Sequence, residues 1–237
     1  MNRVILQLAG IEANLAQYPT TLRKSEALHP LAILHKEQHP PAREILNQLN
    51  RLPLDAAMPF VWREVAEERA EALPVGYFRF PDKTGYVHIK AAADGVTAKM
   101  LDWLDTWVGG EAIRYKILYP GFHAHIEPAG PNALRCITAL RADLDGKGTE
   151  PLSFVVKREP GAGARRAGIT AGPFKAAAVS VVLTRGELHG FIWLGNGLNP
   201  MMRGYFDEKR LYDIARYGAH VAAQTGGVLP GLYEMFR

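Results

Sequence analysis

The sequence predicts an α+β protein in which an antiparallel sheet is wrapped around a long C-terminal helix. From Leu73 the spacing of apolar residues changes from the helical period to alternation, which is typical of strands. The strand-like segments that follow are joined by short turns such as DGKG and TRGE, without helices long enough for parallel crossovers. The last fifth of the chain, from 206 onward, returns to helical spacing, and FDEKRLYDIARYGAHVAAQTGG is expected to form a long helix that ends at Gly226 and Gly227.

Length and composition limit the class of protein. The chain has 237 residues, of which 48% are hydrophobic, as expected for one domain with a large interior or ligand cavity. The net charge of +4 is small and the basic residues are scattered, so we expect no nucleic-acid partner. Cys136 is the single cysteine, which excludes an internal disulfide and a thiolate zinc cluster. We therefore expect a cytoplasmic protein.

The N-terminal quarter has helical character interrupted by prolines. Residues 1–17 are apolar at helical spacing but carry charges, which predicts an amphipathic helix rather than an export signal or a membrane span. We expect 1–55 to be a helical extension and 56–237 to be the main domain. The N-terminal quarter contains three histidines within a segment flanked by prolines, so we interpret them as loop and helix-end residues rather than metal ligands: His29, His35 and His39.

A hairpin and a helix are predicted to open the main domain. The segments GYFRF and GYVHIK alternate in polarity around the turn PDKT, as in a β-hairpin. In VTAKMLDWLDTWVGG, Thr97 can cap a helix that ends at Gly109 and Gly110. Further strands are expected at IRYKILY, HAHIE, LRCITALRADL, PLSFVVKRE, FKAAAVSVVLTR and ELHGFIWLG.

The stretch HAHIE allows two interpretations. On a regular strand, His123, His125 and Glu127 point to one side and could form a metal-binding group. If a turn at Pro120 and Gly121 precedes the strand, His123 faces inward while the other two are solvated. The proline favours the second interpretation, although spacing alone does not decide between them.

The C-terminal helix carries a second candidate pair. His220 and Gln224 are four residues apart, so they share one helix face, as metal-binding pairs do. Because a neutral amide oxygen is a poor zinc ligand, a hydrogen-bonded core histidine is the competing interpretation.

Several segments, in the same order, resemble the diacetylphloroglucinol and phloretin hydrolase family. They are MLDWLDTW on the expected helix, RYKILYPGFH at the turn, GFIWLGNGL on a later strand and HVAAQTGGVLPGLYEMF in the closing helix. The resemblance runs from about Pro53 to the C-terminus. It implies a Bet v 1-like helix-grip fold and a zinc-dependent hydrolase that cuts the C–C bond between an acyl group and a polyphenolic ring.

The same resemblance implies a metal site made from two histidines and two glutamates. The histidines correspond to His123 and His220, whereas the helix glutamate falls on Gln224. The remaining glutamate falls on either Lys157 or Glu159. Each missing carboxylate weakens the hold on a dication, so the site looks altered or lost in this chain. A displaced carboxylate from Glu127 is a further, weaker alternative.

An intact zinc site would activate water for attack on the acyl carbonyl. Tyr115 and Tyr119 are then the candidate proton donors, with ordinary packing as the competing interpretation. A flat aromatic substrate would suit a cavity lined by tryptophans, and three are candidates: Trp103, Trp107 and Trp193. Ordinary packing in the core is an equally reasonable interpretation of these residues.

Three functions therefore remain open. The first is hydrolysis of an acylated aromatic ring, and the second is metal-free binding of an aromatic small molecule in the same cavity. The third is a metal oxygenase that uses HAHIE as its ligand strand. Besides the small-molecule ligand, a homodimer is a partner that the sequence allows.

Overall fold

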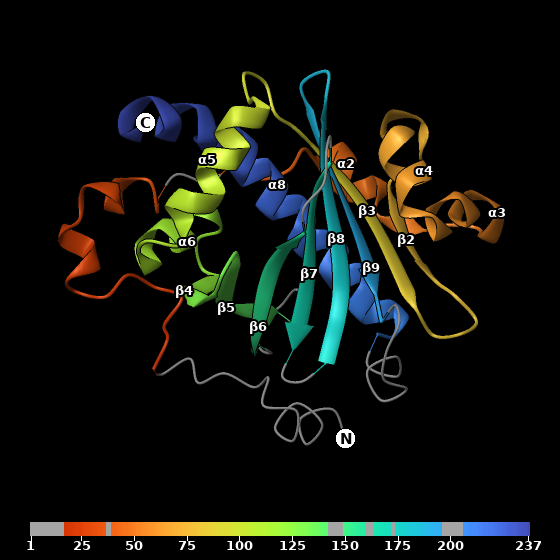
Figure 1. The fold of residues 1–237 in the computed structure, drawn as a ribbon, viewed down its shortest axis with the longest axis horizontal. Coiled ribbons are helices and arrows are strands. Elements are labelled where there is room, and N and C mark those ends of the chain that lie inside the picture. Colours follow the sequence, from red (N-terminus) through yellow and green to blue (C-terminus); the bar gives the residue numbers. More distant parts are fainter. Residues whose placement is uncertain (1–16, 37–38, 142–148, 160–163, 172–173, 196–205) are drawn as a thin grey trace.

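A computed structural model gives the structure of the protein and describes residues 17–36, 39–141, 149–159, 164–171, 174–195 and 206–237. The described residues form a nine-stranded sheet in the order β1-β2-β3-β9-β8-β7-β6-β5-β4, with helices on both faces (Figure 1). Apart from the parallel pair β1 and β2, all neighbouring strands are antiparallel. The predicted α+β class with an antiparallel sheet is confirmed.

The N-terminal part consists of short helical segments on two sides of the sheet (Figure 1). His29 caps η2 by accepting a hydrogen bond from the backbone N–H of Leu31, as expected for a helix-end residue. The predicted amphipathic helix at 1–17 lies almost wholly outside the described residues. The described segments are η1 Glu26–Leu28, η2 Pro30–Ile33, α2 Arg43–Gln48, β1 Asn50–Arg51, α3 Leu54–Ala57, η3 Met58–Val61, α4 Arg63–Glu68 and η4 Ala70–Ala72.

The predicted hairpin is formed by β2, Gly76–Arg79, and β3, Gly85–Ala92. A meander completes the sheet, with β7 as a strand that the periodicity analysis missed. Its strands are β4 His123–Gly130, β5 Ala133–Arg141, β6 Thr149–Glu159, β7 Arg165–Ala171, β8 Phe174–Thr184 and β9 Glu187–Leu194. The predicted turn DGKG lies outside the described residues.

Three longer helices cover one face of the sheet. α5, Ala98–Val108, begins at Thr97, whose hydroxyl accepts the N–H of Met100, and ends before Gly109, as predicted. α6, Ala112–Leu118, connects it to β4, and α8, Glu208–Phe236, crosses the sheet (Figure 1). The opposite face carries α3, η3 and α4. Successive side chains of a strand therefore point alternately toward the α8 layer and toward the opposite face of the sheet.

One predicted strand is in fact a helix. IRYKILY was expected to be extended, yet Ala112–Leu118 forms α6. Ile113 and Ile117, four residues apart, are both buried on one side of this helix. Lys116 is only 1% exposed, and the pairing of its ammonium group with Glu26 at 2.7 Å offsets the cost of burying the charge. An alternating pattern over seven residues fits a helix with a buried ion pair as well as it fits a strand.

The C-terminal helix is longer than the glycine pair suggested. We expected the helix to end at Gly226 and Gly227, but α8 continues to Phe236. A Cβ on Gly226 would collide with the carbonyl oxygen of Ala92 on β3, and one on Gly227 would collide with His39. The glycines are therefore close-contact positions and not a helix end.

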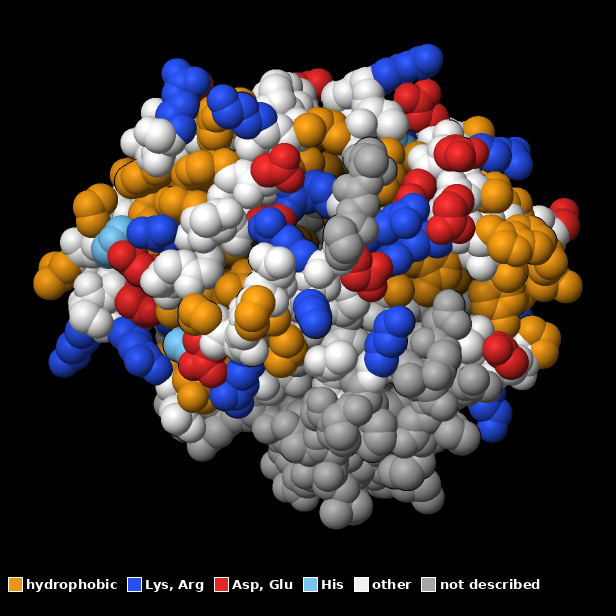
Figure 2. All heavy atoms as spheres, in the orientation of Figure 1, with side chains coloured by type: hydrophobic (Ala, Val, Ile, Leu, Met, Phe, Trp, Pro, Cys, Tyr) orange, Lys and Arg blue, Asp and Glu red, His pale blue; other side chains and the backbone are white. Residues whose placement is uncertain are grey.

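The surface is mixed in character. On the face seen in Figure 2, basic and acidic side chains are interspersed. Exposed apolar side chains gather where α3 and η3 lie, at the right of Figures 1 and 2: Leu54, Met58, Val61 and Trp62. Among the described residues, no helix is long and apolar enough to cross a membrane.

Candidate active site

A cluster of histidines and tyrosines lies where α6, β4 and β5 meet α8. The chain reverses at Pro120 and Gly121, and Gly121 has a φ of 83° that glycine adopts without strain. The carbonyl oxygen of Tyr119 accepts hydrogen bonds from the N–H groups of Phe122 and His123, at 3.2 and 3.1 Å. This turn places His123 at the start of β4, facing α8.

His123 is buried and both of its ring nitrogens are engaged. Nδ1 lies 2.8 Å from the carbonyl oxygen of Tyr115, which can only accept, so Nδ1 carries the proton. Nε2 lies 2.6 Å from the hydroxyl oxygen of Tyr217 on α8. Burial lowers the pKa of His123 to about 3, so the ring is neutral and Nε2 accepts the Tyr217 proton.

Tyr217 belongs to a network of hydroxyl groups. Tyr115 and Thr138, from α6 and β5, are 2.7 Å apart at their hydroxyl oxygens. The hydroxyl of Tyr217 lies close enough to interact with both of them. Burial raises the pKa values of Tyr115 and Tyr217, so both phenols keep their protons at neutral pH. Sequence reasoning identified Tyr115 but missed Tyr217, although Tyr217 lies one helical turn before His220.

Tyr119 lies between the two predicted histidines. Its ring centroid is 5.9 Å from that of His123 and 5.5 Å from that of His220, with the His220 ring stacked at 15°. His220 is half-buried, whereas His123 is 2% exposed. Burial, with a smaller contribution from Arg216, lowers the pKa of His220. His220 is therefore a neutral base within reach of solvent.

His125 and Glu127 do not join this cluster. The pairing of β4 with β5 shifts register between His123 and His125, so that His123 pairs with Thr138 and His125 with Ile137. This bulge turns His125 to the other face, where its Nε2 lies 3.3 Å from Glu127. Of the two interpretations of HAHIE, the structure has the one with a turn and solvated neighbours. This arrangement lends no support to the oxygenase hypothesis.

Gln224 is on α8 near this cluster, but its side-chain amide forms hydrogen bonds with backbone groups of other segments. Its Oε1 accepts the N–H of His39 at 2.7 Å, and its Nε2 donates to the carbonyl oxygen of Ile117 at 3.1 Å. The side chain is 3% exposed. Gln224 thus joins the N-terminal segment, α6 and α8.

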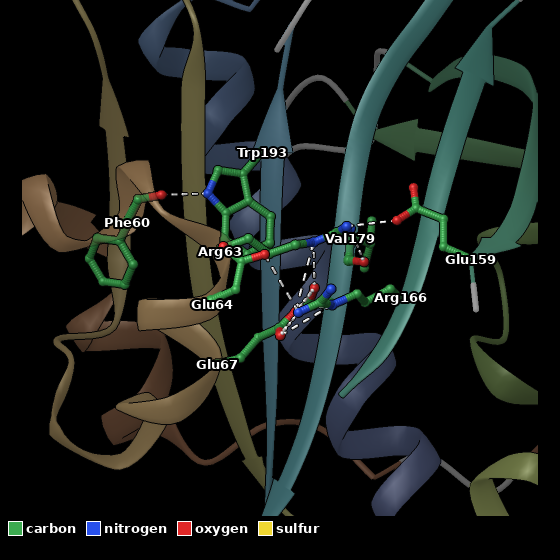
Figure 3. Close-up of polar contacts among 9 residues, drawn as sticks. Phe60, Arg63, Glu64, Glu67, Glu159, Arg166, Val179 and Trp193 are labelled. Carbon is green, nitrogen blue, oxygen red and sulfur yellow. Dashed lines mark hydrogen bonds and ion pairs between the residues drawn. The ribbon is translucent and has the colours of Figure 1, made fainter. Parts of the chain in front are cut away.

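Glu159 lies on the opposite face of the sheet from α8. Figure 3 shows Arg63 and Glu67 of α4 approaching Glu159 and Arg166 on that face, with α8 behind the strands. Arg63 donates to Glu159 at 2.7 Å, and Arg166 holds Glu67 at 2.5 Å. The alternative ligand Lys157 is exposed and, being two residues away, shares this face. The sheet therefore separates this position from His123.

The three predicted tryptophans occupy different places. Trp103 and Trp107 stack on α5 with centroids 5.0 Å apart, and Trp107 is largely buried. Trp193 lies with Phe60 and Tyr86 in the smaller core under η3, where its indole N–H donates to the carbonyl oxygen of Phe60 at 2.6 Å. The structure does not bring all three into one lining.

A second histidine pair, which the sequence did not suggest, lies in the smaller core region. Nδ1 of His88 donates to the carbonyl oxygen of Pro74 at 2.9 Å, and its Nε2 faces Nδ1 of His189 at 3.2 Å. Burial lowers the pKa of His88 to about 3. Strand alternation places this pair on the face opposite to His123.

The side chains in place do not fit the zinc site that the resemblance implies. Both nitrogens of His123 are engaged, the Gln224 amide holds backbone, and Glu159 lies across the sheet. Within the described parts of the chain, no three His, Cys, Asp or Glu side chains group closely enough to hold a metal ion. The zinc that the resemblance implies is tested by metal analysis of the purified protein.

The fold and the cluster define an α+β protein that presents histidine and tyrosine side chains between a long helix and the end of its sheet. The family model described as DAPG hydrolase PhiG domain matches residues 62–148. This partial match agrees with the resemblance over these residues, supports membership of the chain in the DAPG hydrolase family and indicates a hydrolase. It includes Tyr115, Tyr119 and His123 but not α8. No curated protein matches the chain.

Proposed function

We propose that this protein hydrolyses the C–C bond between an acyl group and a polyphenolic or related aromatic ring. The observation that carries the proposal is the family match over 62–148, which includes the aromatic residues of α6 and the His123 turn. The sheet and long helix support a helix-grip fold of the Bet v 1 kind, in which ligands bind between helix and sheet.

The chemistry assigned to the cluster is acid–base. Water adds to the acyl carbonyl, the C–C bond breaks with its electron pair going to the ring carbon, and that carbon takes a proton. The products are a deacylated ring and a carboxylic acid. His220 is the base that accepts the proton of water, because its imidazole is neutral and half-buried.

Tyr119 is the proposed proton donor and ring-binding residue. It lies between His123 and His220 and is stacked with both Phe122, at 4.1 Å, and His220. Tyr115 is held by Thr138 in the buried network and keeps His123 in place through its carbonyl oxygen. We assign Tyr115 a positioning role. Trp103 and Trp107 remain the proposed aromatic contacts for the substrate, on the neighbouring helix α5.

The test is product analysis with purified protein. Phloroglucinol rings carrying one or two acetyl groups should release the deacylated ring and acetate in equal amounts, measured by liquid chromatography with mass spectrometry. Oxygen-18 from labelled water should appear in the acetate. His220→Ala should reduce turnover at least about a hundredfold, whereas His125→Ala, a matched change outside the cluster, should leave it within about twofold.

Two results would refute the proposal. One is the absence of acetate release from every acyl-ring substrate by a folded protein. The other is unchanged turnover in His220→Ala, because hydrolysis would then not use the proposed base.

A further inference from the structure

We propose that the Tyr217 hydroxyl takes the place of a metal on His123, so that this chain holds no divalent metal between His123 and His220. The hydrogen bond between His123 and Tyr217 is the observation that leads to this inference. It concerns a residue that the sequence pattern did not single out.

Distances at His123 leave no room for an ion. Zinc lies about 2.0–2.1 Å from a ligating imidazole nitrogen, so two ligands of one tetrahedral zinc are separated by roughly 3.3 Å. The hydroxyl oxygen of Tyr217 is 2.6 Å from Nε2, which is a hydrogen-bond distance. The other nitrogen, Nδ1, is occupied by the Tyr115 carbonyl oxygen at 2.8 Å.

Tyr217 is fixed by several contacts and is not free to swing away. Its ring contacts Tyr119, with centroids 5.4 Å apart, and approaches His123 edge-on at 5.9 Å. Its hydroxyl is also linked to Tyr115 and Thr138. A metal on Nε2 would have to displace the Tyr217 hydroxyl from its hydrogen bond with His123, and loss of that partner is costly for a buried polar group.

The lack of a carboxylate near His220 on α8, a helix described along its whole length, also argues against a metal ion. A divalent ion in a poorly solvated site needs carboxylates or thiolates to neutralise it. The α8 position one turn after His220 carries the neutral Gln224, whose amide already serves His39 and Ile117. The alternative carboxylate, Glu159, is held by Arg63 on the far face of the sheet.

Hydrolysis, which rests on the function proposed above, then proceeds through imidazole and phenol groups instead of a metal-bound water. Tyr217 acts as a positioning residue in this scheme. By donating to Nε2 it fixes the orientation of His123, against which the Tyr115 ring stacks at 3.7 Å. The Tyr119 ring meets the same imidazole edge-on.

The first experiment measures metal in the full-length protein. After exposure to zinc chloride and desalting, elemental mass spectrometry should find less than about 0.1 zinc per chain. A chelator should change neither the unfolding temperature nor turnover of the acyl-ring substrate by more than the scatter of the assay. Retention of about one zinc per chain that His123→Ala or His220→Ala removes would overturn the inference, as would loss of turnover on chelation.

Tyr217→Phe provides the sharper comparison, because it removes only the hydroxyl. This variant leaves the lone pair of Nε2 without its donor, so His123 becomes available to a metal, although only weakly because among the described residues no carboxylate joins His123 and His220. Zinc in large excess should therefore raise the unfolding temperature of Tyr217→Phe while leaving that of the wild type unchanged. His123→Ala in the Tyr217→Phe background should abolish the response. Zinc responses of equal size in the wild type and Tyr217→Phe would contradict the proposed role of the hydroxyl.

Nitrogen-15 spectra of the wild-type histidines test the same point if Tyr217→Phe does not fold. His123 should show a protonated Nδ1 and an unprotonated Nε2, with no change on addition of zinc. A zinc-dependent shift of Nε2 would overturn the inference. A protein that turns over no acyl-ring substrate but passes these metal tests would refute only the proposed hydrolysis.

Discussion

Replacing Gln224 by glutamate tests how the site is built, because it changes one buried atom from donor to acceptor. In the wild type, Nε2 of Gln224 donates to the carbonyl oxygen of Ile117 at 3.1 Å. A carboxylate there would place two acceptors in contact without a proton between them. Oε1 keeps its bond from the N–H of His39. We therefore expect Gln224→Glu to destabilise the protein.

The expected magnitude follows from the burial of the group. An unsatisfied buried polar group costs about 1–3 kcal/mol, and more if it is charged. For a chain of this length, each kcal/mol lowers the unfolding temperature by roughly 2–4 °C. The unfolding temperature of Gln224→Glu should thus fall by about 2–12 °C at about pH 7.

The loss should depend on pH in a defined direction. Burial raises the pKa of a carboxyl group, and the introduced carboxyl, once protonated, can donate to the Ile117 carbonyl oxygen as the amide does. The folded pKa of the introduced glutamate is therefore above its unfolded value of about 4.3. Its stability contribution is fully present below about pH 4.3 and is lost as the pH rises through the folded pKa.

The assay compares thermal unfolding of the wild type, Gln224→Glu and the exposed control Gln48→Glu at about pH 4 and about pH 7.5, on either side of the expected transition. The control should change the free energy of unfolding by no more than about 0.5 kcal/mol at either pH. Equal stability of Gln224→Glu and the wild type at the higher pH would refute the reasoning. Stabilisation of Gln224→Glu by zinc would do so too, because residue 224 would then face an ion.

Three further predictions concern other buried polar groups. Glu26→Ala should destabilise the protein by about 3–5 kcal/mol, because it leaves the buried ammonium of Lys116 unpaired; adding Lys116→Met should recover most of this loss in chemical denaturation, and no recovery would argue against the pair. His88 has a pKa of about 3 in the folded protein, so below about pH 6.5 it takes up a proton only in the unfolded chain. The free energy of unfolding should therefore fall as the pH is lowered, by up to about 1.4 kcal/mol per pH unit between about pH 6.5 and 3. His88→Gln should remove this part of the slope in urea denaturation, and an unchanged slope would contradict it. Arg166→Ala should cost about 2 kcal/mol or more by thermal unfolding, because Glu67 is only 9% exposed and loses its closest cation. Glu67 also accepts a hydrogen bond from the hydroxyl of Ser180 and pairs with Arg63. A change below about 0.5 kcal/mol would show that these two contacts suffice.

The hairpin and α5 could be predicted because their signals are local. Alternation on both sides of PDKT, and Thr97 before a periodic apolar stripe, depend on residues near in sequence. The α6 segment could not be assigned in the same way. Its burial depends on Glu26, 90 residues earlier, which supplies the partner of Lys116.

The glycine pair in α8 shows the same limit from another direction. Glycines after a periodic segment usually end a helix, yet Gly226 is required by the approach of Ala92 and Gly227 by that of His39. Both contacts join parts of the chain that are far apart in sequence. Local chemistry therefore predicted the class of fold and the start of α8, and only tertiary contacts determine its end.

The candidate site shows why a histidine pattern does not by itself define a metal centre. Pro120, and not spacing, favours an inward-facing His123, and in the structure the turn there and the following bulge separate His123 from His125. What the imidazole binds depends on the group opposite Nε2, which here is a phenol from another element. A tyrosine one turn before a predicted ligand on the same helix can reach the same partner as that ligand. Tyr217 therefore determines whether His123 belongs to a metal site or to a hydrogen-bonded acid–base site. The positions of His123 and His220 alone do not determine this.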